Sequence, residues 1–148
     1  MTEDRGPERR ALEAAAMEAI ESLAFTETLP GTPPEGFLRD HECLAAAIPV
    51  DNGGEMAIWM QRDFLRGLSA TLFTLPPDTV DDAIMLDALL EFLNIVAGRF
   101  MAANGSEERV LTLGLPREKR EGPAWTDYPL FCCLREDAGG YFALGLKP

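Results

Sequence analysis

Residues 87–100 read "DALLEFLNIVAGRF", a mostly apolar stretch whose polar residues follow the spacing of an α-helix. Asp87, Glu91 and Asn94 are separated by four and then three residues, and Gly98 follows four residues after Asn94. At about 100° per residue, these four positions lie along one narrow face of a helix. The stretch therefore predicts a largely buried helix with a single polar line along it. Glu91 and Asn94 should share a solvent-exposed face, and the apolar residues around them should be more buried: Phe92, Leu93, Ile95 and Val96.

An ordinary solvent-exposed face explains this line only in part. Asp87 and Glu91 carry like charges one turn apart, which is unfavourable by a few tenths of a kcal/mol. Asn94 has a low helix propensity, and Gly98 costs up to about 1 kcal/mol relative to alanine. Gly98 also leaves room for another backbone or side chain to approach closely. Spacing alone leaves two interpretations open, a solvated face and a functional one.

Composition and charge narrow the classes of partner. The chain has 148 residues, which fits a single domain over 1–148, and hydrophobic residues make up 47% of it. The formal net charge is −12, from 13 basic and 25 acidic residues. Such a surface repels phosphate backbones and anionic lipid, so we expect neither nucleic acid nor a membrane surface as a partner. A soluble partner that presents a local cation is the better expectation.

The first residues, the lack of a long apolar run and the cysteine spacing predict a cytoplasmic protein. The first ten residues, "MTEDRGPERR", are charged and lack the apolar region of a secretory signal. No apolar run approaches the ~18 residues that span a bilayer. Cys43, Cys132 and Cys133 have no disulfide-framework spacing, which favours reduced thiols. The adjacent pair should point to opposite faces of a strand.

The order of the predicted elements indicates an α+β fold. Helical periodicity marks three segments, at about 8–25, 62–75 and 79–103. Strand and hairpin patterns mark five segments, at 43–50, 55–61, 109–116, 130–137 and 141–146. Residues 28–36 and 117–129 are expected to be loops. Long helices alternating with antiparallel hairpins predict an antiparallel or mixed sheet packed against the helices.

The start of the longest helix offers a capping residue and several acids. Thr79 is the candidate N-cap, and Asp81 and Asp82 follow it in the first turn. Together with Asp87 these acids could suggest a magnesium site. The helix dipole, which favours acids in the first turn, explains Asp81 and Asp82 more simply.

Other candidate sites are weaker. His41, the single histidine, would have to serve any Cys-His or Ser-His nucleophilic pair, and a surface histidine is the simpler interpretation. One histidine and scattered cysteines give no zinc ligand set, so no metal of its own is expected. The basic residues Arg117, Lys119 and Arg120 could grip an anion, although a solvated loop is the ordinary interpretation.

A faint internal repeat links the first and third helices. When residues 17–25, "MEAIESLAF", are laid over residues 87–95, "DALLEFLNI", Glu21 falls on Glu91 and Ala24 falls on Asn94. Each of the two segments is a helix followed by a hairpin. The second copy therefore has the amide and the first copy lacks it.

The polar line resembles the signature helix of the CheX-like branch of the chemotaxis phosphatases CheC, CheX and FliY. That signature is an acid or serine, three residues, glutamate, two residues and asparagine, which matches Asp87, Glu91 and Asn94; the following "IVAG" of residues 95–98 is also similar. Weaker likeness extends to residues 17–27, 110–116 and 139–146. By order of elements the resemblance covers most of the chain, and by motif about a dozen residues.

The resemblance implies a fold, an activity and a set of roles. The family has an α+β fold with internal pseudo-twofold symmetry and removes the phosphoryl group from an aspartate of a CheY-type response-regulator receiver. Asn94 would position the attacking water, Glu91 would pair with the receiver's lysine, and Asp87 and Gly98 would support that face. Magnesium is expected on the receiver, with no cofactor on this chain. The resemblance also implies a homodimer. The apolar strand at 141–146, "YFALGL", is expected near a sheet edge, where it would need a partner strand, and this points the same way.

Two alternatives stay open at this point. A non-catalytic module on the same fold could bind receivers or flagellar-switch proteins, although the presence of both Glu91 and Asn94 favours catalysis. A small-molecule-binding α+β domain is the third possibility, and the lack of another polar constellation makes it the weakest.

Met17 and Ala24 stand where Asp87 and Asn94 stand in the second copy, so one active helix is expected.

Overall fold

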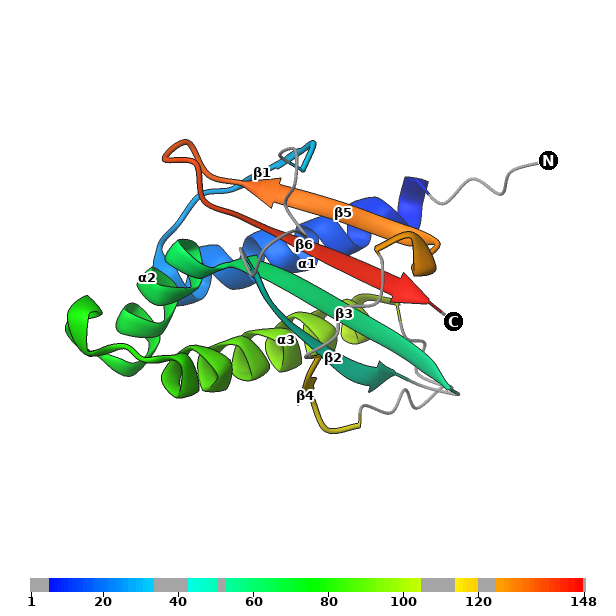
Figure 1. Ribbon diagram of the computed structural model, residues 1–148. Coiled ribbons are helices and arrows are strands. Elements are labelled where there is room, and N and C mark those ends of the chain that lie inside the picture. The colour runs from blue at the N-terminus through cyan, green and yellow to red at the C-terminus, as the bar shows by residue number, and fades with distance from the viewer. Residues whose placement is uncertain (1–5, 34–42, 51–52, 105–113, 120–124, 148) are drawn as a thin grey trace.

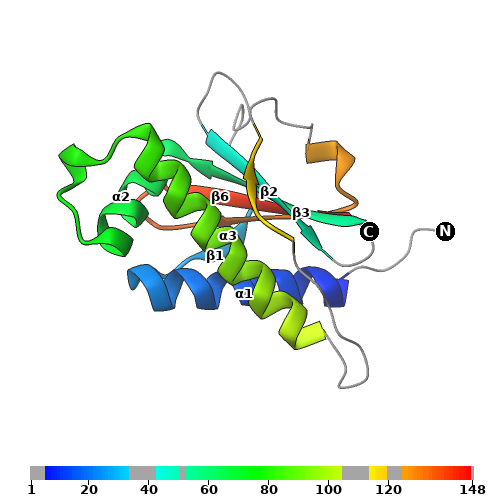
Figure 2. The same cartoon turned by 90° about the horizontal axis from the view of Figure 1, so that it is seen from below.

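The architecture is a sheet with helices packed on one face (Figure 1, Figure 2). The structure is a computed structural model, and it describes residues 6–33, 43–50, 53–104, 114–119 and 125–147. Its helices are α1 (Gly6–Ala24), α2 (Arg62–Phe73) and α3 (Asp82–Asn104), with 3₁₀ turns η1 (Pro77–Thr79) and η2 (Trp125–Asp127). Its strands are β1 (Leu29–Gly31), β2 (Cys43–Val50), β3 (Gly54–Gln61), β4 (Arg117–Glu118), β5 (Leu130–Arg135) and β6 (Tyr141–Lys147).

The six strands form one antiparallel sheet in the order β1-β5-β6-β3-β2-β4. Exchanging β1 with β4, β2 with β5 and β3 with β6 reverses this order and returns the same sheet. The halves, α1-β1-β2-β3 and α3-β4-β5-β6, are therefore related by a pseudo-twofold axis between β3 and β6. The predicted α+β fold with internal symmetry is confirmed, and α2 joins the two halves.

The core lies between the sheet and the helices. Met56, Ile58 and Met60 project from β3 toward it, and all three are fully buried. From α3, the ring of Phe92 meets Phe142 of β6 edge-on, with 5.4 Å between centroids. Each fully buried side chain of this size contributes about 1.5–3 kcal/mol from burial, so this packing fixes the rotation of α3 about its axis.

The opposite face of the sheet has a smaller cluster. Trp59 and Tyr141 are buried there, and the ring of Tyr128 meets Trp59 edge-on at 5.3 Å. Cys133 belongs to this cluster, whereas Cys132 lies in the core beneath the helices. The prediction that the adjacent cysteines point to opposite faces is confirmed.

Strand and helix boundaries differ from the sequence prediction in three places. Residues 29–31 form β1, although the proline-rich sequence predicts a loop there. This strand pairs with β5 at the sheet edge, where proline is tolerated. The strand expected at 109–116 lies mostly outside the described residues, and its described end, 114–116, is not strand. The strand there, β4, begins at Arg117 within the expected loop.

The N-cap assignment of α3 was wrong. Thr79 ends the turn η1, and its hydroxyl donates to the carbonyl of Pro76 at 2.7 Å. Asp81 is the capping residue, because its carboxylate accepts from the backbone N–H of Ile84 at 2.9 Å. The cap was predicted too early because a threonine followed closely by acids also suits the start of a helix.

The expected position of β6 was also wrong. The strand "YFALGL" was expected near a sheet edge, where an unpaired strand would favour a homodimer. In the sheet β6 lies between β5 and β3 and is paired on both sides. The homodimer therefore loses this physical argument and stays an expectation of the resemblance. Within the described residues, each helix is too short or too polar to span a lipid bilayer.

Candidate functional site

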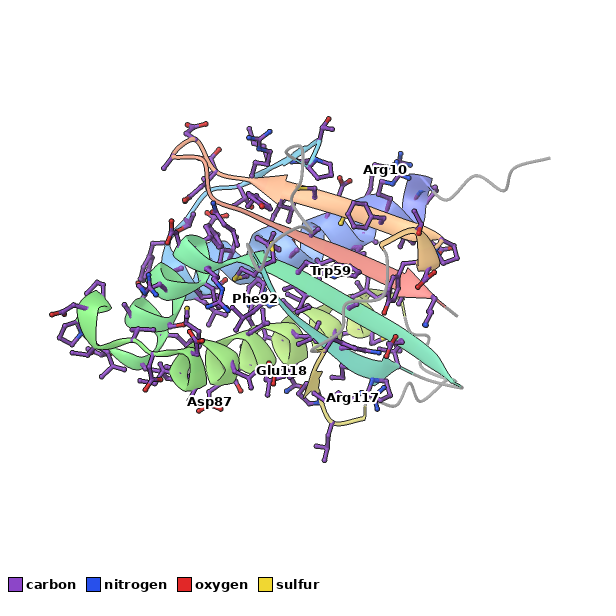
Figure 3. The ribbon with its side chains drawn as sticks, viewed as in Figure 1. Arg10, Trp59, Asp87, Phe92, Arg117 and Glu118 are labelled. Carbon is purple, nitrogen blue, oxygen red and sulfur yellow. The ribbon has the colours of Figure 1, made fainter. Side chains whose placement is uncertain are left out.

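The polar line lies along the side of α3 that faces away from the sheet. Asp87, Glu91 and Asn94 are exposed. Gly98 follows one turn after Asn94 and is half-buried. Figure 3 shows Asp87 on the outer side of the helix and Phe92 on the side that faces the sheet. We call these four residues the α3 stripe. The predicted exposure of Glu91 and Asn94 on a shared face is confirmed.

Buried neighbours hold the stripe in place. Phe92, Leu93 and Val96 have no exposed surface, and Ile95 is half-buried against the core. The larger burial of these four residues was predicted from the helical spacing and is confirmed. Because the apolar side of α3 is locked into the core, the stripe is presented to solvent on a rigid element.

Apolar side chains border the stripe on both sides, a feature that sequence reasoning missed. Ile84, Leu90, Ile95 and Met101 are half-buried. At about 100° per residue, Ile84 and Ile95 lie on one side of the stripe and Leu90 and Met101 on the other. A helical projection of residues 82–104 carries this signal. The surface around the stripe thus combines polar groups with partly accessible apolar groups, and protein interfaces use both kinds of contact.

The cations around α3 are engaged elsewhere. Arg99 contacts α1, with 3.8 Å between its guanidinium and the Glu18 carboxylate and 3.5 Å to the Ser22 hydroxyl. Arg62 pairs with Asp82 at 3.1 Å. Within the described ranges, no ion pair or side-chain hydrogen bond involves Asp87, Glu91 or Asn94. Glu91 is therefore available to a cation of another molecule.

Gly98 is not required by packing within the described chain. A Cβ atom built at this position meets no atom within 4 Å. The glycine costs helix stability and fills no tight contact in return. The open surface beside Asn94 is consistent with close approach of a partner at this point.

The corresponding face of α1 lacks the amide. Glu21, which corresponds to Glu91, is exposed, but Met17 and Ala24 are half-buried apolar residues. Neither can orient a water molecule. The chain therefore presents the full set of acid, glutamate and asparagine on α3 and not on α1.

The predicted basic loop has a structural use. The cations of Arg117, Lys119 and Lys147 lie 3.5, 3.1 and 3.4 Å from carboxylate oxygens of Glu55. Glu55 is buried on β3, and the hydroxyl of Tyr128 donates to it at 2.7 Å. The two loop cations thus neutralise a buried carboxylate and are not held ready for an external anion. Sequence reasoning missed Glu55, because β3 reads as an apolar strand.

The remaining candidates form no second site. Arg120 and His41 lie outside the described residues. Asp81 caps α3 and Asp82 pairs with Arg62, so neither is free to build a magnesium site with Asp87. Among the described residues, no three His, Cys, Asp or Glu side chains gather in a way that would hold a metal ion.

Comparison of the fold with solved structures identifies its type. CheX from Vibrio vulnificus superposes with a TM-score of 0.69 at 14% identity, covering 99% of this chain and 100% of that one. A CheX from Borrelia burgdorferi, solved in a complex with CheY, BeF₃ and Mg²⁺, gives 0.69 at 16% identity, with 94% and 97% covered. This chain has the CheX fold.

The same fold also occurs in FliY. FliY from Thermotoga maritima gives a TM-score of 0.61 at 9% identity, covering 95% of this chain and 86% of that one. No protein-family model matches the sequence. No curated protein matches it either.

Proposed function

We propose that this chain is a phosphatase that hydrolyses the aspartyl phosphate of a CheY-type receiver domain in the cytoplasm. The observation that carries the proposal is the α3 stripe, in which Glu91 and Asn94 are exposed and unpaired among the described residues. Support also comes from the fold, since a CheX that shares it has been solved in a complex with CheY.

Asn94 is the group that we assign to the attacking water. An amide can accept and donate hydrogen bonds at once, and it does not compete as a nucleophile. The water oxygen attacks phosphorus as the bond from phosphorus to the aspartyl oxygen breaks. The products are inorganic phosphate, which takes the water's proton on an oxygen, and the free aspartate. Catalysis of this kind rests on positioning, which can supply several kcal/mol.

Glu91 is the residue that we assign to docking. Its carboxylate lies one turn from Asn94 on the same face, so a lysine of the receiver that pairs with it would fix the register of the two proteins. Asp87 and Gly98 support this face, the first by charge and the second by leaving it open. Magnesium, when bound to the receiver, would neutralise charge on the phosphoryl oxygens, and this chain contributes no ligand to it.

The test is phosphate release from a CheY-type receiver that has been phosphorylated with a small phosphodonor. Wild-type protein should accelerate release over the spontaneous rate. Asn94→Ala should lower the accelerated rate at least about tenfold, equivalent to ~1.4 kcal/mol, while receiver binding changes little. Circular dichroism serves as the folding control. A folded Asn94→Ala variant with full activity would remove the amide from the mechanism.

The second candidate is a non-catalytic interaction module. FliM from H. pylori supports it, because this protein has the same fold, at a TM-score of 0.61 and 9% identity, and was solved in a complex with SpeE. It predicts receiver binding without any acceleration of phosphate release. Wild-type protein that binds the phosphorylated receiver and leaves its lifetime unchanged would establish this alternative.

The homodimer implied by the resemblance is a separate expectation, and a monomeric mass by light scattering at high micromolar concentration would contradict it.

A further inference from the structure

A cavity of about 240 Å³ lies away from the α3 stripe, between the end of α1, α2 and the turn that joins β5 to β6. Its floor is apolar and includes Ile20, Phe64 and Leu68. Two small residues, Ala24 on α1 and Gly67 on α2, also line it. A Cβ atom built at Gly67 meets nothing within 4 Å, so the glycine leaves this space open.

Two carboxylates lie at the polar rim of the cavity. Asp63 is 88% exposed, and its contact with Arg66 on the same helix is long, at 3.8 Å. Glu136 is half-buried and takes part in no ion pair within the described part of the chain. Gly140 makes room for it, because a Cβ atom there would collide with a carboxylate oxygen of Glu136 and with the ring of Phe64. The rim therefore offers negative charge that the described chain leaves largely uncompensated.

Phe25 lies in sequence between two residues that line the cavity, Ala24 and Thr26. It ends α1 in the left-handed region with a φ of 54°, and its side chain is 87% exposed. The backbone of a bulky residue is strained in this conformation, whereas glycine adopts it freely. Folding alone would favour glycine here, so an exposed aromatic ring at this strained position points to contact with another molecule.

We infer that this cavity and Phe25 form a binding site for an arginine side chain presented by a partner protein. The apolar stem of arginine suits the floor, and its guanidinium suits the carboxylates of Asp63 and Glu136. The exposed ring of Phe25 offers a face for the same cation. The volume is below the 300–1,000 Å³ of pockets for drug-sized molecules, which favours a single side chain over a metabolite. No lining residue belongs to α3, so the site does not depend on the proposed phosphatase activity.

The test is an NMR titration of the full ¹⁵N-labelled chain with the peptide acetyl-Gly-Arg-Gly-amide. Its control is the same peptide with citrulline, which keeps the shape of arginine and removes the charge. The arginine peptide should give saturable shifts of the amides of Ala24, Gly67 and Thr71. The citrulline peptide should bind at least about tenfold more weakly. Equal binding of both peptides, or no shift with either, would overturn the inference.

Two variants separate binding from folding. Gly67→Leu should fill the cavity and abolish the shifts, because the space is open and leucine is a good helix former. Ala14→Leu, at an exposed position on α1, is the matched control and should bind like wild type. Phe25→Gly should weaken peptide binding while the melting temperature stays level or rises. A folded Gly67→Leu variant that binds normally, or a Phe25→Gly variant that loses stability and keeps binding, would contradict the site.

Discussion

The hydroxyl of Tyr128 donates a 2.7 Å hydrogen bond to Glu55, a residue 73 positions earlier in the chain. The side chain of Glu55 is only 11% exposed, and Lys119 and Lys147 lie 3.1 and 3.4 Å from its carboxylate. One buried carboxylate thus ties β3 to β6, to the segment after β4 and to the residue after η2. This network closes the sheet at the end opposite the turn of Glu136.

Glu55→Gln should destabilise the protein by about 2 kcal/mol at pH 7, because hydrogen bonds to a charged group contribute about 1.5–3 kcal/mol. The amide oxygen can still accept from Tyr128, but it no longer compensates the three cations. Urea unfolding gives the change in the free energy of unfolding. Glu21→Gln, at an exposed position on α1, is the matched control and should change it little.

The pH dependence of this difference follows from the pKa of Glu55. Burial acts to raise that pKa, but the hydrogen bond from Tyr128 and the ammonium groups of Lys119 and Lys147 outweigh it and hold the pKa below 4.5. The stabilisation is therefore present above pH 4.5 and is lost as the pH falls through the folded-state pKa. The gap between wild type and Glu55→Gln should narrow on acidification. A gap that stays constant from pH 7 to strongly acidic conditions would show that the charge of Glu55 contributes nothing.

The cysteines should differ in their reaction with thiol reagents. Burial raises the pKa of Cys132 to about 12 and that of Cys133 to about 11. Because the thiolate is the reactive form, both should react slowly at pH 8. Cys43 is half-buried and should be alkylated first in the folded protein. Mass spectrometry after brief iodoacetamide treatment checks this order, with urea-unfolded protein as the control in which all three react.

Hydrophobic periodicity predicted the helices and the two hairpins of the fold. The period of 3.6 residues gave the three helices, and the alternation around "DNGG" and "AGG" gave both hairpins. The short edge strands were not predictable. Leu29–Gly31 contains a proline, and Arg117–Glu118 is charged; both are strands only because the first strand of a distant hairpin pairs with them. Such pairing is tertiary and leaves no local pattern.

The candidate site was predictable where residues broke a local rule. Asn94 and Gly98 are poor helix formers in a good helix, and that conflict marked the stripe. Glu55 broke no visible rule, because a single acid before an apolar strand looks like a solvated strand end. Its partners come from residues 117–147, so only the fold brings them together. The acids around the cavity of α2 were hidden for the same reason.

Gly98→Ala should separate stability from function on α3. Alanine has the higher helix propensity, and a Cβ atom meets nothing at Gly98, so the free energy of unfolding should rise by up to about 1 kcal/mol. Receiver dephosphorylation should fall, since the methyl group stands where the partner approaches. Gly67→Ala is the matched control: it too has open space and should gain stability without loss of phosphatase activity. Equal activities for the two variants would show that Gly98 has no part in docking.

Glu91→Ala tests the division of labour within the stripe. Glu91 is exposed and unpaired among the described residues, so its removal should leave the fold intact. We expect weaker receiver binding together with a lower rate, because the variant loses the partner for a lysine on the receiver, whereas Asn94→Ala should lower the rate alone. Glu21→Ala makes the same change at the corresponding position of α1, where Met17 and Ala24 replace the acid and the amide. It should leave both binding and rate at the wild-type level. Rate and binding are separated by measuring phosphate release at saturating and at limiting receiver. If Glu21→Ala and Glu91→Ala are equally impaired, the receiver binds through the acidic charge of both helices, and the assignment of docking to Glu91 alone is wrong.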